Sequence, residues 1–312
     1  SQIHLMNIKS LIASQKVRHF LMKSCFWLPD NLMLSIQYYL ISHRWPNLKS
    51  PTRFTEKIQY YKMYYRNPVM LQCVDKFAVR RYVEEKMGNN GILNKLYQVC
   101  NSANEIEFSV LPNQFVVKTT DGGNGDNVLI VKDKKNLDIP RAIRLINSWR
   151  NKKFYVVSRE WAYKGASKSQ IIVEKFLEDE TVADNTLIDY KFYCFSGEPY
   201  VCQIISDRFS NEHIDFYDMD WNRLHGVVGL NAKATNSPIE FQKPKNFERM
   251  IDVAKSLSTD FPFVRVDLYN INGAIYFGEL TFYPASGYGS FKPDSFDFEL
   301  GKLFDLAKIQ NL

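Results

Sequence analysis

The sequence lacks the motifs of several common enzyme classes. It contains no G-x-x-x-x-G-K-[ST] phosphate loop, no G-x-G-x-x-G that opens a helix, and no H-E-x-x-H. It also lacks any run of about 18 uninterrupted apolar residues, the length that argues for a transmembrane helix. We therefore expect neither a P-loop enzyme nor a dinucleotide-binding enzyme, no zinc-binding histidine motif, and no membrane span.

Cysteine is sparse and unpaired. The five cysteines are odd in number and scattered, and no two of them form C-x-x-C; they are Cys25, Cys73, Cys100, Cys194 and Cys202. The five histidines are equally isolated. Neither a disulfide framework nor a structural zinc site is indicated, so we expect a protein of the reducing cytoplasm.

The composition is that of a globular chain. Its 312 residues, 45% of them hydrophobic, can bury one large core or two to three lobes. The formal charge is +6, from 40 basic and 34 acidic residues, and it is spread over the whole length. This balance favours anionic ligands such as phosphates or uronates, or a membrane surface. It does not single out nucleic acid, and no nucleic-acid partner is expected.

The first 50 residues are expected to form a helical extension. Within them, IKSLIASQKVRHFLMKSCFWLPDNLMLSIQYYL mixes basic residues with Phe20, Phe26 and Trp27. Such a helix can pack its apolar face on the protein body or lie at a membrane interface, and packing is the preferred interpretation. We expect a cytoplasmic protein, with peripheral contact at the inner face of the cell membrane as the open alternative.

The pattern of elements predicts an α+β fold. Helices are expected over residues 29–45, 50–66 and 67–88; Ser50 is a candidate N-cap before Pro51, and Gly88 ends the third. Strands are expected at 115–118, 127–131, 170–177, 189–195, 200–206, 263–269 and 274–280, and further helices at 139–151 and 246–258. Short turns such as FSGEP and YNING predict mainly antiparallel pairs. Boundaries are expected near 89–91 and 179–186.

The stretch FVVKTTDGGNGDNVLIVKD is a candidate phosphate loop. Lys118 ends an apolar run, and three glycines follow, Gly122, Gly123 and Gly125. The loop leads into another strand, so it can fold over a triphosphate as a flap that offers backbone N–H groups. It can equally be a long hairpin, and by itself it does not distinguish the two.

Charged residues gather on two strands near the C-terminus. Arg265 and Asp267 are two positions apart and share a face, as do Glu279 and Thr281 on the next strand. If the two faces coincide, two carboxylates and an arginine converge. Such carboxylates suit Mg²⁺, and the arginine suits charge that develops at a reacting carbonyl or phosphoryl group. A buried ion pair without function would be costly, so we favour the functional interpretation.

Two segments between these motifs suit a nucleotide. The apolar strand IIV leads into a short stretch that can present backbone groups and apolar faces to a purine: Glu174, Lys175, Phe176 and Leu177. Asp189 and Lys191 share a strand face and could bind ribose and phosphate. A surface ion pair would explain either of the last two alone.

The ordered set of motifs resembles the ATP-grasp superfamily. The set is D-K (Asp75, Lys76), V-V-K (Lys118) with its glycine loop, V-E-K-F-L (174–177), D-Y-K (189–191), R-V-D (265–267), and E-L-T (279–281) followed by P-A-S-G. More narrowly, it resembles the TupA-like ATP-grasp proteins associated with teichuronopeptide and capsular polysaccharide synthesis. The resemblance covers about residues 45–300.

The resemblance implies an ATP site. Lys76 and Lys118 would flank the phosphates, Lys191 would lie near them, and Asp189 would lie near the ribose. The lid loop would contain Gly122, Gly123 and Gly125. The adenine hinge would consist of Glu174, Lys175, Phe176 and Leu177.

It also implies a metal and catalytic end. Asp267 and Glu279 would ligate one or two Mg²⁺, and Arg265 would stabilise the acyl-transfer transition state. Lys118 and Lys191 would neutralise charge as the phosphoryl group is transferred. Thr281 stands where many ATP-grasp ligases have an asparagine that completes the metal shell. Because a hydroxyl is a weaker ligand than an amide carbonyl, the number of metal ions stays open.

The implied function is that of an ATP-dependent carboxylate–amine ligase. It would form ADP through an acyl phosphate and join an amino acid to a uronic acid carboxylate of a capsular or cell-surface polysaccharide or its precursor. The implied fold has two α+β lobes that grip ATP between antiparallel sheets. The expected regions are the extension 1–50, a substrate or pre-grasp region 51–110, a lid subdomain 111–177, and a C-terminal subdomain 178–312 with the metal site.

Two other functions fit parts of the sequence. Asp218 and Asp220 form a D-x-D, the spelling of many glycosyltransferase metal sites, but a solvated hairpin end explains them better. A non-catalytic carbohydrate-binding module fits the 14% aromatic content, yet it would not need the converging charges.

An acceptor surface for an anionic glycan is expected in the helical first third, where cations alternate with tyrosines. The candidates are Arg53 and Lys57, with Lys62 and Arg66 nearby. A solvated helix face over packed tyrosines explains the pattern equally. Ser286 and Gly287, which follow the predicted metal strand, are candidates for acceptor contact.

Overall fold

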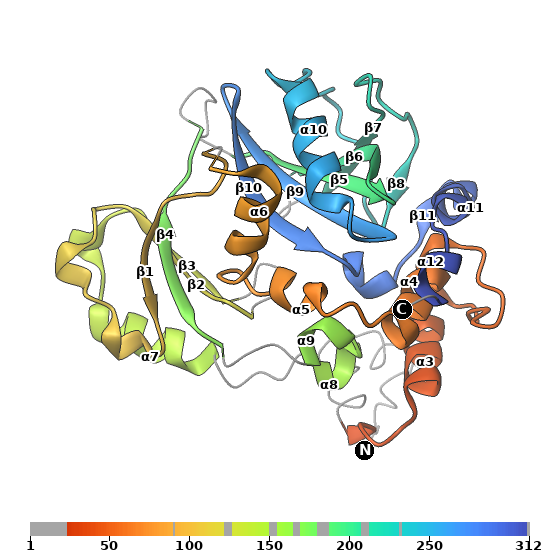
Figure 1. The fold of residues 1–312 in the computed structure, drawn as a ribbon, viewed down its shortest axis with the longest axis horizontal. Coiled ribbons are helices and arrows are strands. Elements are labelled where there is room, and N and C mark those ends of the chain that lie inside the picture. The colour runs from red at the N-terminus through yellow and green to blue at the C-terminus, as the bar shows by residue number, and fades with distance from the viewer. Residues whose placement is uncertain are drawn as a thin grey trace, which may run out of the picture.

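The protein folds around two antiparallel sheets, in a computed structural model that describes residues 24–89, 91–121, 127–149, 155–164, 169–179, 187–206, 212–230 and 233–310. A four-stranded sheet has the order β1-β4-β2-β3, and a five-stranded sheet has the order β10-β9-β5-β6-β7. Every pairing in them is antiparallel. The predicted α+β class with antiparallel sheets is confirmed (Figure 1).

The helical first third differs in detail from the prediction. Its helices are α3 (Asp30–Ser42), α4 (Phe54–Tyr64), α5 (Val69–Cys73) and α6 (Val79–Met87). Ser50 is not the N-cap of α4: the helix begins at Phe54, and the Glu56 carboxylate accepts hydrogen bonds from the backbone N–H groups of Thr52 and Arg53, at 3.1 and 3.2 Å.

The predicted helix 67–88 is broken in two. Asp75 Oδ1 accepts from the backbone N–H groups of Phe77 and Ala78, at 2.9 and 2.8 Å, and this local turn competes with a continuous helix. Gly88, at φ 66°, follows the end of α6 as predicted.

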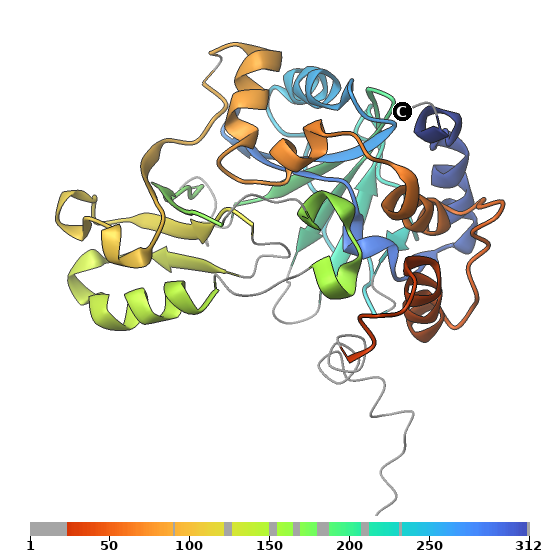
Figure 2. The same cartoon turned by 60° about the horizontal axis from the view of Figure 1, so that its bottom comes forward.

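The four-stranded sheet and α7 form one lobe (Figures 1 and 2). Its strands are β1 (Leu96–Cys100), β2 (Phe115–Thr119), β3 (Val128–Val131) and β4 (Ile171–Lys175), and α7 spans Ile139–Trp149. Phe115, Val117 and Val173 pack with Ile146 of α7 in one apolar cluster. Alternation then turns Lys118 and Glu174 to the opposite face.

Strand β1 was not predicted, since most of its residues are only half-buried and give a weak apolar pattern. It pairs with β4, so the predicted boundary at residue 110 cuts this sheet. The polar NNG at 89–91 precedes β1 and is the better boundary.

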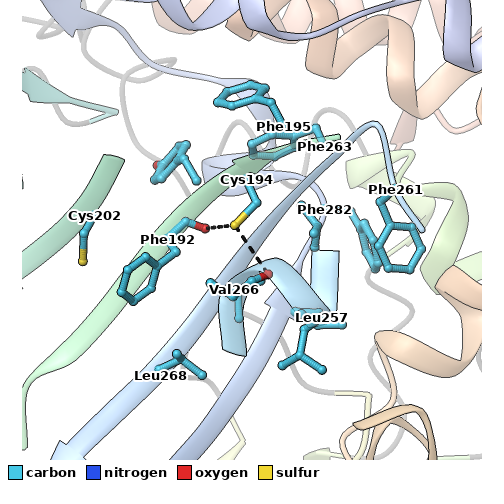
Figure 3. Packing of buried hydrophobic residues seen from close by; sticks show 14 of the residues in the cluster. Phe192, Cys194, Phe195, Cys202, Leu257, Phe261, Phe263, Val266, Leu268 and Phe282 are labelled. Carbon is cyan, nitrogen blue, oxygen red and sulfur yellow. Dashed lines mark hydrogen bonds between the residues drawn. The ribbon is translucent and has the colours of Figure 1, made fainter. Parts of the chain in front are cut away.

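The five-stranded sheet carries the larger core. It consists of β5 (Asp189–Phe195), β6 (Glu198–Ser206), β7 (His213–Tyr217), β9 (Phe263–Ile271) and β10 (Ala274–Thr281). Helix α10 (Phe247–Ser258) covers one face, where Phe192, Cys194 and Val266 pack against Leu257 (Figure 3). This apolar face leaves the alternate residues of β5 and β9 to the other side of the sheet.

Several further short elements complete the fold. They are α8 (Tyr155–Ser158), α9 (Trp161–Lys164), β8 (Val228–Gly229), the short 3-10 turn η4 (Pro284–Gly287), β11 (Phe291–Lys292), α11 (Asp294–Leu303) and α12 (Ala307–Gln310). Helix α4 contacts η4, α11 and α12. In the part of the chain that the structure describes, no helix is long and apolar enough to cross a membrane.

Candidate active site

A charged network lies on the face of the five-stranded sheet away from α10. Lys191 of β5 and Asp267 of β9 are paired in register, and directly opposed residues of antiparallel strands share a face. Asp267 Oδ2 accepts from Lys191 Nζ at 2.6 Å and from Arg265 Nη2 at 2.7 Å, and its Oδ1 accepts from Arg265 Nε at 2.7 Å. Lys191 also donates to Asp189. Two cations thus hold one buried carboxylate.

A β-bulge brings Glu279 into this network. The ladder between β9 and β10 shifts between Phe277 and Glu279, so that Glu279, and not Gly278, lies opposite Asp267. Glu279 Oε1 lies 3.5 Å from Arg265 Nη2 and accepts from Thr281 Oγ1 at 3.2 Å. Arg265 Nη2 also donates to Thr281 Oγ1, at 3.1 Å. The structure therefore brings Arg265, Asp267, Glu279 and Thr281 together.

The network fixes the charge of its members. Burial by itself would raise the pKa of Asp267, but Arg265 and Lys191 outweigh it, so that pKa is lowered. Burial likewise opposes the charge on Arg265, yet Asp267 raises its pKa on balance. The pKa of Asp189 is raised, because burial outweighs the attraction of Lys191. Asp267 is therefore an anion between two cations, and the partly exposed Glu279 side chain lies beside it.

A second ion-pair cluster lies on the four-stranded sheet. Glu174 Oε2 accepts from Lys118 Nζ at 3.1 Å, and Glu174 Oε1 accepts from Arg80 Nη1 of α6 at 3.3 Å. Glu174 is thus an anchor for Lys118, a role that differs from the adenine hinge predicted for it. Arg80 was missed, because its sequence pattern does not distinguish it from Arg81, which is exposed and pairs with Glu85.

Lys76 lies between the two clusters. Its backbone N–H donates to Thr120 O at 2.9 Å, directly after β2. Burial lowers the pKa of Lys76, while Glu279 raises it and Lys118 lowers it. Its ammonium group is therefore within electrostatic range of the metal-binding candidates on one sheet and of Lys118 on the other.

The predicted adenine hinge follows β4. The N–H of Lys175 donates to Lys95 O, and its carbonyl accepts from Asn94 Nδ2, both at 2.8 Å. Its backbone is thereby engaged within the lobe, and its side chain is exposed. Phe176 and Leu177 come next and are half-buried. Gly122, Gly123 and Gly125 of the predicted lid loop lie outside the described residues.

Arg53 and Lys57 lie apart from these clusters. Arg53 Nη1 and Nη2 donate to the Asp294 carboxylate at 2.5 and 2.8 Å, and Lys57 Nζ donates to the carbonyls of Gly301 and Phe304, both at 2.7 Å. Both cations hold the C-terminal helix α11. These contacts argue against the predicted role in acceptor binding, and we leave both residues out of the proposed site.

The D-x-D segment forms a local turn. Asp218 Oδ1 accepts from the backbone N–H groups of Asp220 and Asn222, at 3.0 and 2.7 Å, as an Asx turn does. Across the described ranges, no group of three or more His, Cys, Asp and Glu side chains is arranged to hold a metal ion. The geometry therefore matches the hairpin-end interpretation of Asp218.

Comparison with known proteins gives a family match and several similar structures. Residues 56–305 match the family model described as TupA-like ATPgrasp. Among solved structures, it is similar to D-alanine–D-alanine ligase from Bacillus anthracis, at 16% identity over 77% of this chain and 69% of that chain, with a TM-score of 0.43. It is also similar to L-amino acid ligase from Bacillus licheniformis, at 13% identity over 89% and 57%, with a TM-score of 0.41. No curated protein matches the chain.

The family match spans both sheets and every described ion pair of the two clusters. The chain thus has the ATP-grasp fold. It belongs to the TupA-like ATP-grasp family.

Proposed function

We propose that the protein is an ATP-dependent carboxylate–amine ligase that works through an acyl phosphate. The observation that carries this proposal is the opposed pair Asp267 and Glu279, flanked by Arg265 and Lys191 on one sheet, with Lys118 on the other sheet. Lys76 is within electrostatic range of both sheets. A nucleotide between the sheets would meet cations at its phosphates and carboxylates at a metal.

The residues fit one Mg²⁺ bound together with phosphate. Asp267 and Glu279 are hard oxygen ligands on neighbouring strands, and Mg²⁺ commonly takes one or two carboxylates plus substrate phosphates and waters. Thr281 would be a weaker third ligand. Bound there, the metal would neutralise charge on the transferred phosphoryl group. Both oxygens of Asp267 now accept from cations, so Lys191 or Arg265 would release one of them to the metal.

The nucleotide would lie with its phosphates toward Lys118, Lys76 and Lys191. Phe176 and Leu177 would receive the adenine, and Asp189 the ribose. Gly122, Gly123 and Gly125, which lie outside the described residues, stay proposed phosphate-binding residues. Glu174 and Arg80 would hold Lys118 in place, because a lysine side chain that is already ordered loses less entropy on binding phosphate.

The reaction joins two substrates without a protein nucleophile. An oxygen of the substrate carboxylate attacks the γ-phosphorus, and the bond to the β,γ-bridging oxygen breaks with release of ADP. The amine then attacks the acyl carbon, and phosphate leaves with the electron pair of its C–O bond. Arg265 would stabilise the oxyanion, since a guanidinium in a water-poor site acts strongly on developing charge.

The substrates we propose are an amino acid and a uronic acid carboxylate of a capsular or cell-surface polysaccharide or its precursor. The family and the basic, Mg-compatible site support this class, as does the net charge of +6. A cytoplasmic place of action at the inner face of the membrane follows from such a substrate. Phe26 and Trp27, which are 62% and 70% exposed, are the described residues that would make peripheral membrane contact.

Product analysis tests the proposal. The protein is incubated with Mg-ATP, uronic acid glycosides and a panel of amino acids, and nucleotides and amides are quantified. ADP with an amide is the expected result. AMP would overturn the acyl-phosphate route, and turnover of a UDP-sugar without ATP would favour a glycosyltransferase that uses Asp218 and Asp220.

A further inference from the structure

A buried chain of polar groups lies beside the proposed site, outside the ATP and metal residues. Lys62 of α4 is 1% exposed, and Glu160, just before α9, is 5% exposed. Lys62 Nζ donates to Ser286 Oγ at 2.7 Å, and Ser286 Oγ donates to Glu160 Oε1, also at 2.7 Å. Lys62 Nζ donates to the Ser286 carbonyl as well, at 2.7 Å. A hydroxyl therefore links a buried base to a buried cation.

The turn that carries Ser286 is strained and tightly held. Ala285, Ser286 and Gly287 have φ values of 45°, 57° and 67°, a left-handed region that costs a non-glycine residue on the order of 1 kcal/mol. Gln59 Nε2 donates to the carbonyls of Ser286 and Gly287 at 3.0 and 2.8 Å. At Gly287, a Cβ atom would lie 2.5 Å from Gln59 Nε2, so the close approach of α4 requires glycine.

This turn is close to the metal end of the proposed site. Ser286 follows Thr281, the last residue of β10, by five positions and is half-buried. Burial raises the pKa of Tyr163 in α9, and both Glu160 and Glu279 raise it further. Tyr163 is thus within electrostatic range of both groups.

We propose that Ser286 and Glu160 form a proton relay that takes the proton of the attacking amine, with Lys62 holding the relay in place. The inference rests on the proposed ligase function. It names the step that the ATP and metal residues leave unassigned, because an amino acid is mostly an ammonium ion at neutral pH and cannot attack until it loses a proton.

The relay balances as a proton transfer. The ammonium N–H bond breaks and its proton passes to Ser286 Oγ, while the Oγ–H proton passes to Glu160 Oε1. The lone pair that is released attacks the acyl carbon, and the second proton that the nitrogen loses as the amide forms leaves on the departing phosphate. The hydrogen bond that Lys62 donates to Oγ leaves the second lone pair of that oxygen for the amine. Ser286 would touch the substrate, and Lys62 acts as a positioning residue.

The electrostatics suit this role. Burial raises the pKa of Glu160 to about 7, against the opposing charge of Lys62 and the hydrogen bond from Ser286. Burial lowers the pKa of Lys62 to about 7, with Glu160 opposing. A base with a pKa near the working pH is the most effective proton acceptor.

Among the described residues, the contacts and charges place tyrosines and one arginine around the relay. Burial raises the pKa of Tyr163 and of Tyr283, so both stay neutral. The ring centroid of Tyr288 lies 4.4 Å from Lys62 Nζ. Arg66 Nη1 donates to the Lys62 carbonyl at 2.9 Å. Glu160 is thus the proton acceptor in this surrounding.

The test compares two nucleophiles. Hydroxylamine is unprotonated at neutral pH and traps an acyl phosphate as a hydroxamate, whereas an amino acid must first lose a proton. In Glu160→Gln, we expect amide formation to fall about 100-fold and hydroxamate formation to stay near the wild-type rate. Ser286→Ala should likewise lower the rate of amide formation and leave the rate of hydroxamate formation near that of the wild type. Glu248→Gln, in an exposed ion pair with Lys243, is the matched control and should change neither rate.

The outcomes separate the two proposals. If wild-type protein with Mg-ATP and the glycoside gives neither ADP nor hydroxamate, the ligase function is wrong, and the relay with it. If wild-type protein gives both but Glu160→Gln lowers hydroxamate and amide formation equally, the ligase stands and the relay is overturned.

A second variant, Lys62→Met, tests the relay if Glu160→Gln does not fold. Lys62 lowers the pKa of Glu160, so its removal in Lys62→Met raises that pKa further. Glu160 must be ionised to accept a proton, so the acid limb of kcat for amide formation should move to higher pH. A purely structural role of Lys62 would lower activity without moving that limb, and such a result would refute the relay.

Discussion

Lys191 and Asp267 lie directly opposite each other on β5 and β9, with Nζ and Oδ2 2.6 Å apart. Arg265 holds the same carboxylate through two hydrogen bonds of 2.7 Å. One buried anion therefore organises the two cations that the proposed reaction needs at the transferred phosphoryl group and at the acyl carbon.

Asp267→Asn should remove most of the activity. An amide carries no charge, so it binds Mg²⁺ more weakly than a carboxylate does and leaves Lys191 and Arg265 without their shared anion. We expect kcat/KM for ATP-dependent amide formation to fall about 100-fold or more, which corresponds to roughly 2.7 kcal/mol. Steady-state kinetics with coupled detection of ADP measures this change in kcat/KM. Asp218→Asn is the control and should retain wild-type rates, and the reverse pattern would show that the site lies at the D-x-D segment.

Glu174→Gln should weaken ATP binding. The variant removes the anion that Lys118 and Arg80 share, so Lys118 would no longer be held toward the phosphates. We expect KM for ATP to rise about tenfold, a size typical of residues that orient a ligand-binding group. Lys118→Ala should raise the KM for ATP at least as much. Arg81→Gln, which removes an exposed ion pair on the same helix as Arg80, should leave that KM unchanged. An unchanged KM in Glu174→Gln alone would mean that Lys118 needs no anchor.

Gly278→Ala tests the β-bulge. A Cβ atom there would lie 2.9 Å from the Asp267 carbonyl oxygen, so β10 must shift against β9. We expect a loss of stability of about 1–3 kcal/mol in urea unfolding, and a loss of activity in the molecules that remain folded.

Gly301→Ala is the matched control for the bulge. Its Cβ would lie 2.1 Å from Thr52 O, so it should destabilise the contact of α11 with α4. Because that contact involves none of the proposed active-site residues, activity per folded molecule should be unchanged. Full activity of Gly278→Ala would show that the position of Glu279 does not depend on the bulge.

Lys57→Met should affect stability and leave binding intact. The ammonium donates to two carbonyls at the end of α11, and a typical intramolecular hydrogen bond contributes about 0.5–1.5 kcal/mol. We expect the free energy of unfolding to fall by about 1–2 kcal/mol, with an unchanged KM for the glycan substrate. A raised KM at unchanged stability would restore the acceptor role that the sequence analysis left open.

The strands were predictable because their sequence signal is local. The segment 189–195 matches β5 in full, and 263–269 and 274–280 match most of β9 and β10. Runs of β-branched and aromatic residues between short turns give this signal without tertiary information. The pairs Arg265 with Asp267 and Asp189 with Lys191 also follow from alternation within one strand.

The convergence of Glu279 on Asp267 was not predictable in this way. From the Ile271–Ala274 pair, a regular ladder would place Glu279 opposite Val266, on the apolar face under α10. The one-residue bulge moves it to the charged face. The alternation of side chains along a strand does not reveal a bulge, because the position of the bulge depends on packing against the neighbouring strand.

The sequence by itself determined the antiparallel strands, the order of the charged motifs and the family to which the chain belongs. The tertiary structure decided which charges meet. It paired Glu174 with Lys118 and Arg80, turned Arg53 and Lys57 to the C-terminal helix, and joined Lys62 to Glu160 through Ser286. Local patterns fix what a strand or helix is, whereas contacts between residues far apart in the sequence depend on how the sheets and helices pack.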